Sequence, residues 1–208
     1  MSVKMVVTNK SRDSVKVWLT LGAVDGCTQD VNGIFGISSL DPSKGYFSLS
    51  AGENISYTPE VGFNGNLAIE SEPMNCPTPE FPNGINLFEF IINNYFQEGN
   101  PQETIDISCV SGVNAYLSVD LGGGGDWNAG PTQSKVTSIK NAELRNNTGL
   151  VGVYPYGCDD CTAIASPPVC AGHQDYAKPQ KEAICNVQRD AVVDAEGIIA
   201  VNFLGMTK

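Results

Sequence analysis

The sequence predicts an all-β sandwich with a small, loop-rich appendage that contains cysteines. Glycine is abundant, twelve prolines are scattered along 208 residues, and polar turn clusters recur at short spacing. No long segment repeats apolar residues at helical spacing, so many short strands are favoured over helices. A chain of this length buries roughly 70% of its unfolded surface and does not depend on disulfides for a core.

The first half of the chain contains a predicted hairpin and three further strands. Val3–Val7 and Val15–Leu21 alternate apolar and polar residues around a polar turn at 9–13, which gives each strand one face for the core. Trp18 falls on the polar face of its strand, where it either packs against a second layer or is exposed. Residues 22–45 indicate a long loop with one short strand, and turn residues separate strands at 46–50, 54–58 and 65–70.

Two β-like runs in the middle of the chain each contain a carboxylate. Asn86–Tyr95 carries Glu89 and Glu103–Asn114 carries Asp106, and both runs are rich in aromatic and β-branched residues. An acid in such a strand either lines a cleft or is an ordinary charge on a solvated face. Both interpretations stay open at this point.

The rest of the chain suggests a core and an appendage. Residues 1–133 would form the sandwich, completed by a C-terminal strand within 190–208, and residues 134–189 would form the small cysteine-containing domain, with a short helix near 181–187. The four glycines at 122–125 are not followed by Gly-Lys-Ser/Thr, so they predict a flexible loop and not a phosphate site.

All of the net charge arises in the central block. Between Gly45 and Ser134 there are eleven acids and no lysine or arginine, whereas twelve acids and twelve bases balance elsewhere, which gives the net charge of −11. Such a field repels phosphate backbones and anionic lipids, so neither nucleic acid nor membrane is expected as a partner. Cations or neutral polyhydroxyl ligands suit it better, and the alternative is that the charge only maintains solubility.

The cysteines and the single histidine do not form a recognisable catalytic motif. Cys158-Asp-Asp-Cys161 has the spacing of redox pairs and zinc knuckles, but its aspartates disfavour a thiolate and no second close pair completes a zinc site. No serine in a nucleophile-elbow motif accompanies His173, so a serine-type catalytic triad is not expected. We expect structural disulfides or buried thiols among the seven cysteines, no bound metal and no cofactor.

Four motifs occur in the order Ser50–Glu53, Gly65–Ser71, Asn86–Phe90 and Ile105–Asn114. They resemble the S/P-G-E, G-R-I-W-A-R-T, L-A-E-F and Y-D-V-S-L-V-D-G-F-N patterns of the thaumatin-like (pathogenesis-related 5, osmotin-type) family. The closing residues Ile199–Phe203 are similar to the end of that family's sequence. The resemblance implies a β-sandwich with a disulfide-containing second domain and a role in plant defence.

The resemblance also implies an acidic cleft lined by an arginine, a glutamate and three aspartates. Glu89 matches the glutamate and Asp106 the first aspartate, so these two form the expected catalytic pair. Glu70 stands where the family has its arginine, Ser111 where it has its second aspartate, and Asp194 is a candidate for the last acid. We expect these three to line the ligand-binding cleft, where Glu70 would raise the pKa values of neighbouring acids by like-charge repulsion.

Three functions are compatible with these residues. The first is a defence-type protein that binds a polysaccharide such as β-1,3-glucan in an acidic cleft, with weak or no hydrolysis. The second is an enzyme that uses Glu89 as general acid or base on a small molecule such as a cation. The third is a non-catalytic interaction or inhibitor protein. We expect a monomer.

The expected location is not settled by the sequence. The resemblance and the sequons at Asn9, Asn54 and Asn146 favour secretion. The first nine residues lack an apolar signal segment, however, and the chain has fewer cysteines than the family. Both features also fit a cytoplasmic protein.

Overall fold

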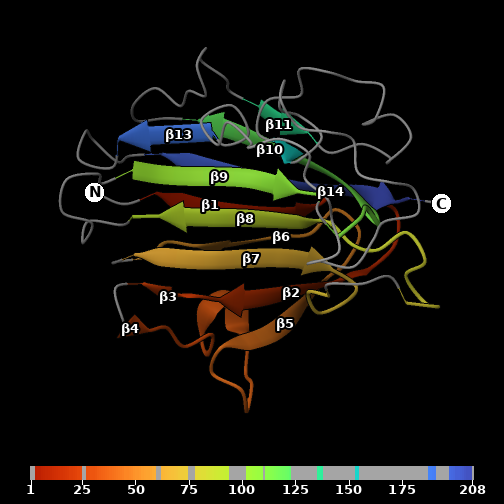
Figure 1. Ribbon diagram of the computed structural model, residues 1–208, viewed down its shortest axis with the longest axis horizontal. Coiled ribbons are helices and arrows are strands. Elements are labelled where there is room, and N and C mark those ends of the chain that lie inside the picture. The colour runs from red at the N-terminus through yellow and green to blue at the C-terminus, as the bar shows by residue number, and fades with distance from the viewer. Residues whose placement is uncertain are drawn as a thin grey trace, which may run out of the picture.

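The computed structural model is a sandwich of two β-sheets, with the larger sheet in front in Figure 1. The structure describes residues 3–24, 27–59, 62–74, 78–93, 102–109, 111–122, 135–137, 153–154, 187–190 and 197–207. Within these ranges the only helical element is the 3-10 turn η1 (Ile34–Gly36). The prediction of an all-β sandwich is confirmed. Among the described residues, no helix has the length and apolar character needed to cross a membrane.

Each sheet mixes strands from distant parts of the chain. The five-stranded sheet has the order β11 (Lys135–Thr137), β10 (Ala115–Gly122), β14 (Ile198–Met206), β1 (Lys4–Asn9) and β6 (Asn54–Tyr57). The seven-stranded sheet has the order β12 (Val153–Tyr154), β9 (Gln102–Ser108), β8 (Leu87–Ile92), β7 (Phe63–Ile69), β2 (Val15–Leu21) and β5 (Lys44–Leu49), with β13 (Val187–Asp190) also paired to β9. A separate short pair joins β3 (Ala23–Val24) to β4 (Cys27–Thr28).

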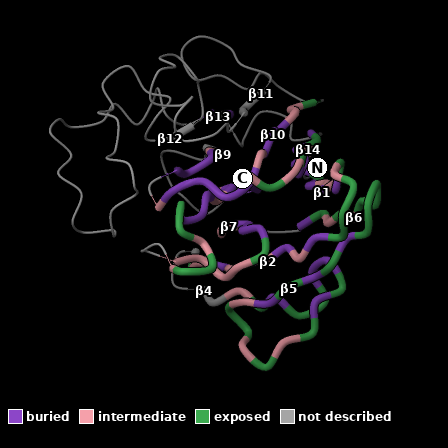
Figure 2. The backbone as a smooth tube through the Cα atoms, turned by 90° about the vertical axis from the view of Figure 1, so that its right-hand side faces the viewer, coloured by how far each residue is buried: buried purple, intermediate pink, exposed green. Residues whose placement is uncertain are grey.

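The core lies between the two sheets, which are separated in the side view of Figure 2. Alternate residues of each strand are buried there because side chains of a strand point to opposite faces. Aromatic rings run through this layer with centroids between 4.6 and 5.9 Å apart, in contacts that connect Phe47, Phe35, Tyr57, Phe63, Phe90 and Phe88. The alternate residues of the larger sheet that do not enter the core, such as those of β2 and β8, are only partly buried and lie on its outer face.

The hairpin predicted for the first two strands does not form. β1 pairs with β14 and β6 in one sheet, whereas β2 pairs with β5 and β7 in the other. Both strands alternate as expected, but their apolar faces point toward each other across the core, so the chain between them crosses from sheet to sheet. Periodicity identifies the buried face of a strand and does not identify its partner.

Asn9 holds this crossover in place. Its Nδ2 donates to the carbonyl oxygens of Asp13, Leu49 and Ser50 at 2.8 to 3.1 Å, and its Oδ1 accepts from the backbone N and the hydroxyl of Ser11. The side chain therefore joins the β1–β2 crossover to the end of β5. Since Asn9 is fully buried, its sequon cannot carry a glycan in this fold, whereas Asn54 is exposed.

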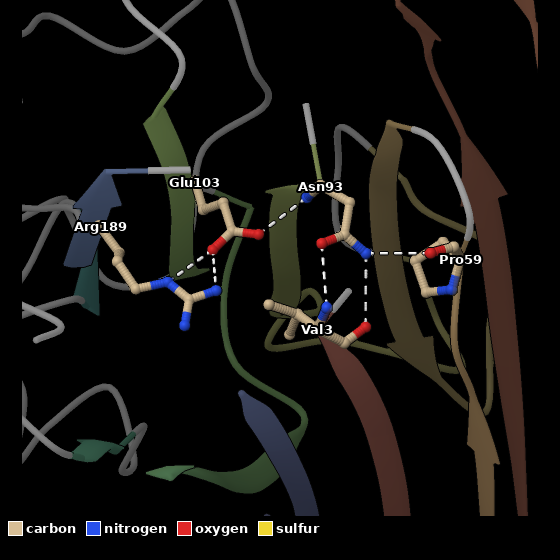
Figure 3. A network of polar contacts seen from close by, with 5 residues as sticks. All are labelled: Val3, Pro59, Asn93, Glu103 and Arg189. Atoms are coloured by element: carbon tan, nitrogen blue, oxygen red, sulfur yellow. Dashed lines mark hydrogen bonds and ion pairs between the residues drawn. The ribbon is translucent and has the colours of Figure 1, made fainter. Parts of the chain in front are cut away.

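Two more buried asparagines bracket β8. Before the strand, Asn86 accepts from the backbone N of Asn114 and of Ala115 and donates to the carbonyl of Ala115. After the strand, Asn93 accepts from Val3 N at 2.9 Å and donates to Pro59 O at 3.1 Å (Figure 3). All of these partners precede, follow or begin strands of the other sheet. Both ends of β8 are thus fixed to the five-stranded sheet.

The predicted second domain is described only in part. Within 134–189 the described pieces are β11, which pairs with β10, and β12 and part of β13, which pair with β9. The helix expected near 181–187 lies outside the described residues except for Val187, which begins β13. Cys109 is buried in the core. The cysteines at 76, 158, 161, 170 and 185, and with them most of the expected disulfides, lie outside the described residues, so the division into domains stays a prediction.

Replacing Asn9 should destabilise the sandwich. Asn9→Ala leaves the carbonyl of Leu49 without its buried side-chain donor, and we expect the free energy of unfolding to fall by about 3 kcal/mol. Urea denaturation followed by tryptophan fluorescence measures the change. Asn54→Ala, at an exposed asparagine, serves as the control and should shift stability by less than about 0.5 kcal/mol. Equal effects of the two changes would contradict the role of Asn9.

Candidate functional site

Four polar side chains stand in one row across the outer face of the seven-stranded sheet. Thr20 of β2 pairs with Asn66 of β7, Asn66 pairs with Glu89 of β8, and Glu89 pairs with Asp106 of β9. Directly paired residues point to the same face of a sheet. The residues beside them in each strand, such as Leu19 and Leu67, are buried on the opposite face. The register of four strands therefore creates the row.

The row forms one side of a pocket of about 400 Å³. A second row on the same face also lines the pocket and contains Gly22, Asn64, Ile91 and Thr104. Leu21, Gly65 and Phe90, which lie between the two rows along their strands, complete the described lining. A volume of this size is in the range of small-molecule binding sites. None of the described lining residues is a lysine or an arginine.

Three oxygens in this pocket are buried without a hydrogen-bond partner. They are Thr20 Oγ1, Asn66 Oδ1 and Asp106 Oδ1, and they are the only buried side-chain polar atoms of the described residues that lack one. A buried polar group without a partner costs on the order of 1–3 kcal/mol, so folded proteins seldom keep one without a reason. All three belong to the same row, which points to a ligand that supplies the missing hydrogen bonds.

The two carboxyl groups of the row share a proton. Burial raises the pKa of Asp106 well above its usual range, and the neighbouring charge and hydrogen bond of Glu89 raise it further. Burial also raises the pKa of Glu89, although hydrogen bonds from Ser108 and Asp106 act in the opposite direction. Like charges directly opposite on neighbouring strands repel. The raised pKa values and the hydrogen bond between the two groups therefore favour one proton held between Asp106 and Glu89.

Glu103, a second acid of β9, is a buried carboxylate whose charge is balanced by a cation and by hydrogen bonds. Glu103 faces the core side, where its carboxylate pairs with the Arg189 guanidinium of β13 and accepts from the backbone N of Asn93 at 2.9 Å (Figure 3). Glu103 and Arg189 are both buried. Asp106, three residues along the same strand, has no cation among its interactions with the part of the chain that the structure describes. A buried carboxylate that is paired with a cation and hydrogen-bonded is typical of a structural role, whereas a buried carboxyl group without a cation is typical of functional sites.

The structure brings together two of the five predicted site residues. Glu89 and Asp106 are adjacent, as expected from neighbouring strands. Glu70 lies elsewhere, because it follows β7 at a positive φ of 66° and exchanges hydrogen bonds with the backbone of Lys16 through its own N and Oε1. Ser111 is in a turn whose carbonyl accepts from Ile85 N at 3.1 Å. Neither lines the pocket, and Asp194 lies outside the described residues.

Sequence reasoning missed Thr20 and Asn66. Both are outward-facing polar residues in strands that were predicted, and such residues usually do no more than face solvent. The available signal is positional: Thr20 is the last outward-facing residue of β2, and Asn66 is a strand-disfavoured residue inside β7. Only the register shows that they line up with the acids.

The row does not favour a single metal ion. It spans three strand spacings, roughly 14 Å, whereas the oxygens around a hard cation lie within about 2.6 Å of it. Among the described residues, no group of three or more histidines, cysteines or acids is placed to hold a metal. An extended ligand suits the spacing better.

Two solved structures align with nearly the whole chain. One is the thaumatin-like xylanase inhibitor TLXI, with 11% identity over 96% of this chain and 97% of that chain, at a TM-score of 0.47. The other is the protein elicitor MoHrip2 from Magnaporthe oryzae, with 10% identity over 97% of this chain and 98% of that chain, at 0.45. No protein-family model and no curated protein sequence matches. Such remote similarity does not define a function, which depends on the residues of the chain itself.

The shared proton predicts how stability varies with pH. Because both pKa values are raised in the folded state, folding binds protons, and the pair loses stability as pH rises from the unfolded values near 4 through the raised folded ones. Asp106→Asn keeps a donor for Glu89 and removes the part of this loss that comes from Asp106. Its stability relative to the wild type should therefore increase as the pH rises above the unfolded values near 4.

Urea denaturation at several pH values measures this difference. Glu80→Gln is the matched control, since Glu80 is an exposed acid of the same central block. Its stability should follow the wild-type pH profile. A profile for Asp106→Asn that also runs parallel to the wild type would rule out the shared proton.

Proposed function

We propose that the chain is a thaumatin-like, defence-type protein that binds a polysaccharide such as β-1,3-glucan in this pocket and hydrolyses it weakly or not at all. The observation that carries the proposal is the row of Thr20, Asn66 and Asp106, each with a buried oxygen that has no hydrogen-bond partner. These oxygens accept hydrogen bonds. A polyhydroxyl chain brings several donors at once, and it carries no negative charge for the acidic surroundings to repel.

The close contact of the two acids argues against efficient glycoside hydrolysis. Retaining enzymes hold their carboxyl groups about 5 Å apart, and inverting enzymes hold them about 6.5–9.5 Å apart to admit a water. Glu89 and Asp106 are instead joined by a hydrogen bond. A carboxyl pair that uses its proton internally is suited to accept sugar hydroxyls and is poorly suited to protonate a leaving group.

Removing the acidic pair should abolish polysaccharide binding. The double change Glu89→Gln with Asp106→Asn should lower retention on insoluble β-1,3-glucan by about ten- to a hundredfold, the range for hydrogen bonds to charged groups. Asn66→Ala changes no charge and should lower it by about tenfold. Glu80→Gln, with its exposed acid outside the pocket, should bind as the wild type does. No release of reducing ends is expected.

Two results of this experiment would reject the proposal. One is a wild-type protein that does not bind the glucan. The other is a double variant that binds as well as the wild type. Rapid hydrolysis by the wild type would reject the binding-only part and favour an enzyme.

A small cation is the second candidate ligand. It is favoured by the two carboxyl groups in a pocket whose described lining has no basic side chain. In a thermal-shift screen of basic metabolites, a binder should raise the melting temperature of the wild type, and Glu89→Gln should remove the rise because the ion pair is lost. An unchanged shift in Glu89→Gln would exclude this role. A pure interaction protein would respond to neither the glucan nor the cations.

A further inference from the structure

We propose that the saccharide-binding face extends beyond the pocket to a second subsite formed by the rings of Trp18 and Tyr46. The proposal rests on the proposed function, because this subsite takes the next residues of the same saccharide chain. Trp18 of β2 and Tyr46 of β5 are directly paired, and their ring centroids are 5.0 Å apart at an interplanar angle of 51°. Tyr46 is 50% exposed, and Lys16 Nζ lies over its ring at 4.7 Å from the centroid, so a saccharide would replace this ammonium on the ring face.

The aromatic pair begins where the pocket ends. Trp18 lies two residues from Thr20 along β2, about 7 Å away and on the same face. Tyr46 lies two residues from Lys44, which pairs with Thr20 in the register of the polar row. The pocket lining stops at β2, and β5 is the edge strand of the sheet. A ligand that follows the row toward this edge reaches Lys44 on β5, and the two rings lie two residues along β2 and β5 from that position.

The chemistry of the two parts is complementary for a sugar chain. A pyranose ring presents hydroxyl groups around its rim and C–H groups on its faces. The rim matches the unpartnered oxygens of the row, and the faces match the electron-rich faces of aromatic rings. Lys44, two residues from Tyr46 on β5, forms an ion pair of 2.6 Å with Glu72. These groups offer further hydrogen bonds at the rim of the subsite.

The spacing of the sheet sets the length of the ligand. Neighbouring strands are about 4.8 Å apart, which is close to the advance of one pyranose residue along an extended chain. The polar row crosses β9, β8, β7 and β2, and the aromatic pair adds β5. A saccharide lying across the strands would therefore occupy about five strand positions. Its affinity should depend on chain length up to about that number of residues.

Titration calorimetry with β-1,3-gluco-oligosaccharides of two to six residues tests the subsite. In the wild type, affinity should rise by about tenfold between the trisaccharide and the pentasaccharide. Tyr46→Ala should remove this gain and leave trisaccharide affinity unchanged, whereas Tyr46→Phe keeps the ring and should keep the gain. Met206→Ala is the matched control, because it removes an exposed apolar side chain from β14 of the other sheet.

The outcomes separate this inference from the proposed function. Trisaccharide binding without a gain for longer chains, or a gain that survives in Tyr46→Ala, would overturn the aromatic subsite while pocket binding stands. Failure of every oligosaccharide to bind would overturn both. A gain lost only in Tyr46→Ala supports the subsite, since a general effect of losing apolar surface would appear in Met206→Ala as well.

Discussion

The buried side-chain amides at the ends of the sandwich are the interaction on which the rest of the structure depends. A chain that crosses repeatedly between two sheets leaves backbone groups that no strand partner satisfies, and each must find a hydrogen bond. Asn9 supplies them at one crossover, and Asn86 and Asn93 supply them at both ends of β8. An amide is suited to this because it donates and accepts without bringing a charge into the core.

The hydrogen bonds of Asn86 and Asn93 at the ends of β8 matter for the site because β8 carries Glu89. A slip of one residue would turn Glu89 into the core and Phe88 and Phe90 out of it. With both ends of β8 tied to the opposite sheet, that register is fixed, and its neighbours β7 and β9 take theirs from it. The row of polar residues is thus positioned by contacts on the far side of the sheet, and within the row only Glu89 and Asp106 are joined by a hydrogen bond.

Local pattern was enough to predict most strands but not how they pair. The alternation in Val15–Leu21 and the β-branched runs around Glu89 and Asp106 identify strands and their buried faces, and neighbouring strands place the two acids together. The absence of a hairpin between β1 and β2 depends on Asn9 and on partners nearly two hundred residues away in β14. Glu70 could not be placed because its backbone turns at a positive φ after β7.

The two acids of β9, Glu103 and Asp106, show how one strand serves both stability and binding. Glu103, on the core face, meets Arg189 and the backbone of Asn93, so its desolvation is offset inside the protein. Asp106, on the outer face, has a pKa raised well above its usual range, and its Oδ1 is buried without a partner among the donor groups of the described residues. Any ligand that donates to this oxygen removes a cost already present in the free protein. The cost of burying these oxygens without hydrogen bonds is therefore recovered when a ligand with matching donors binds along the row.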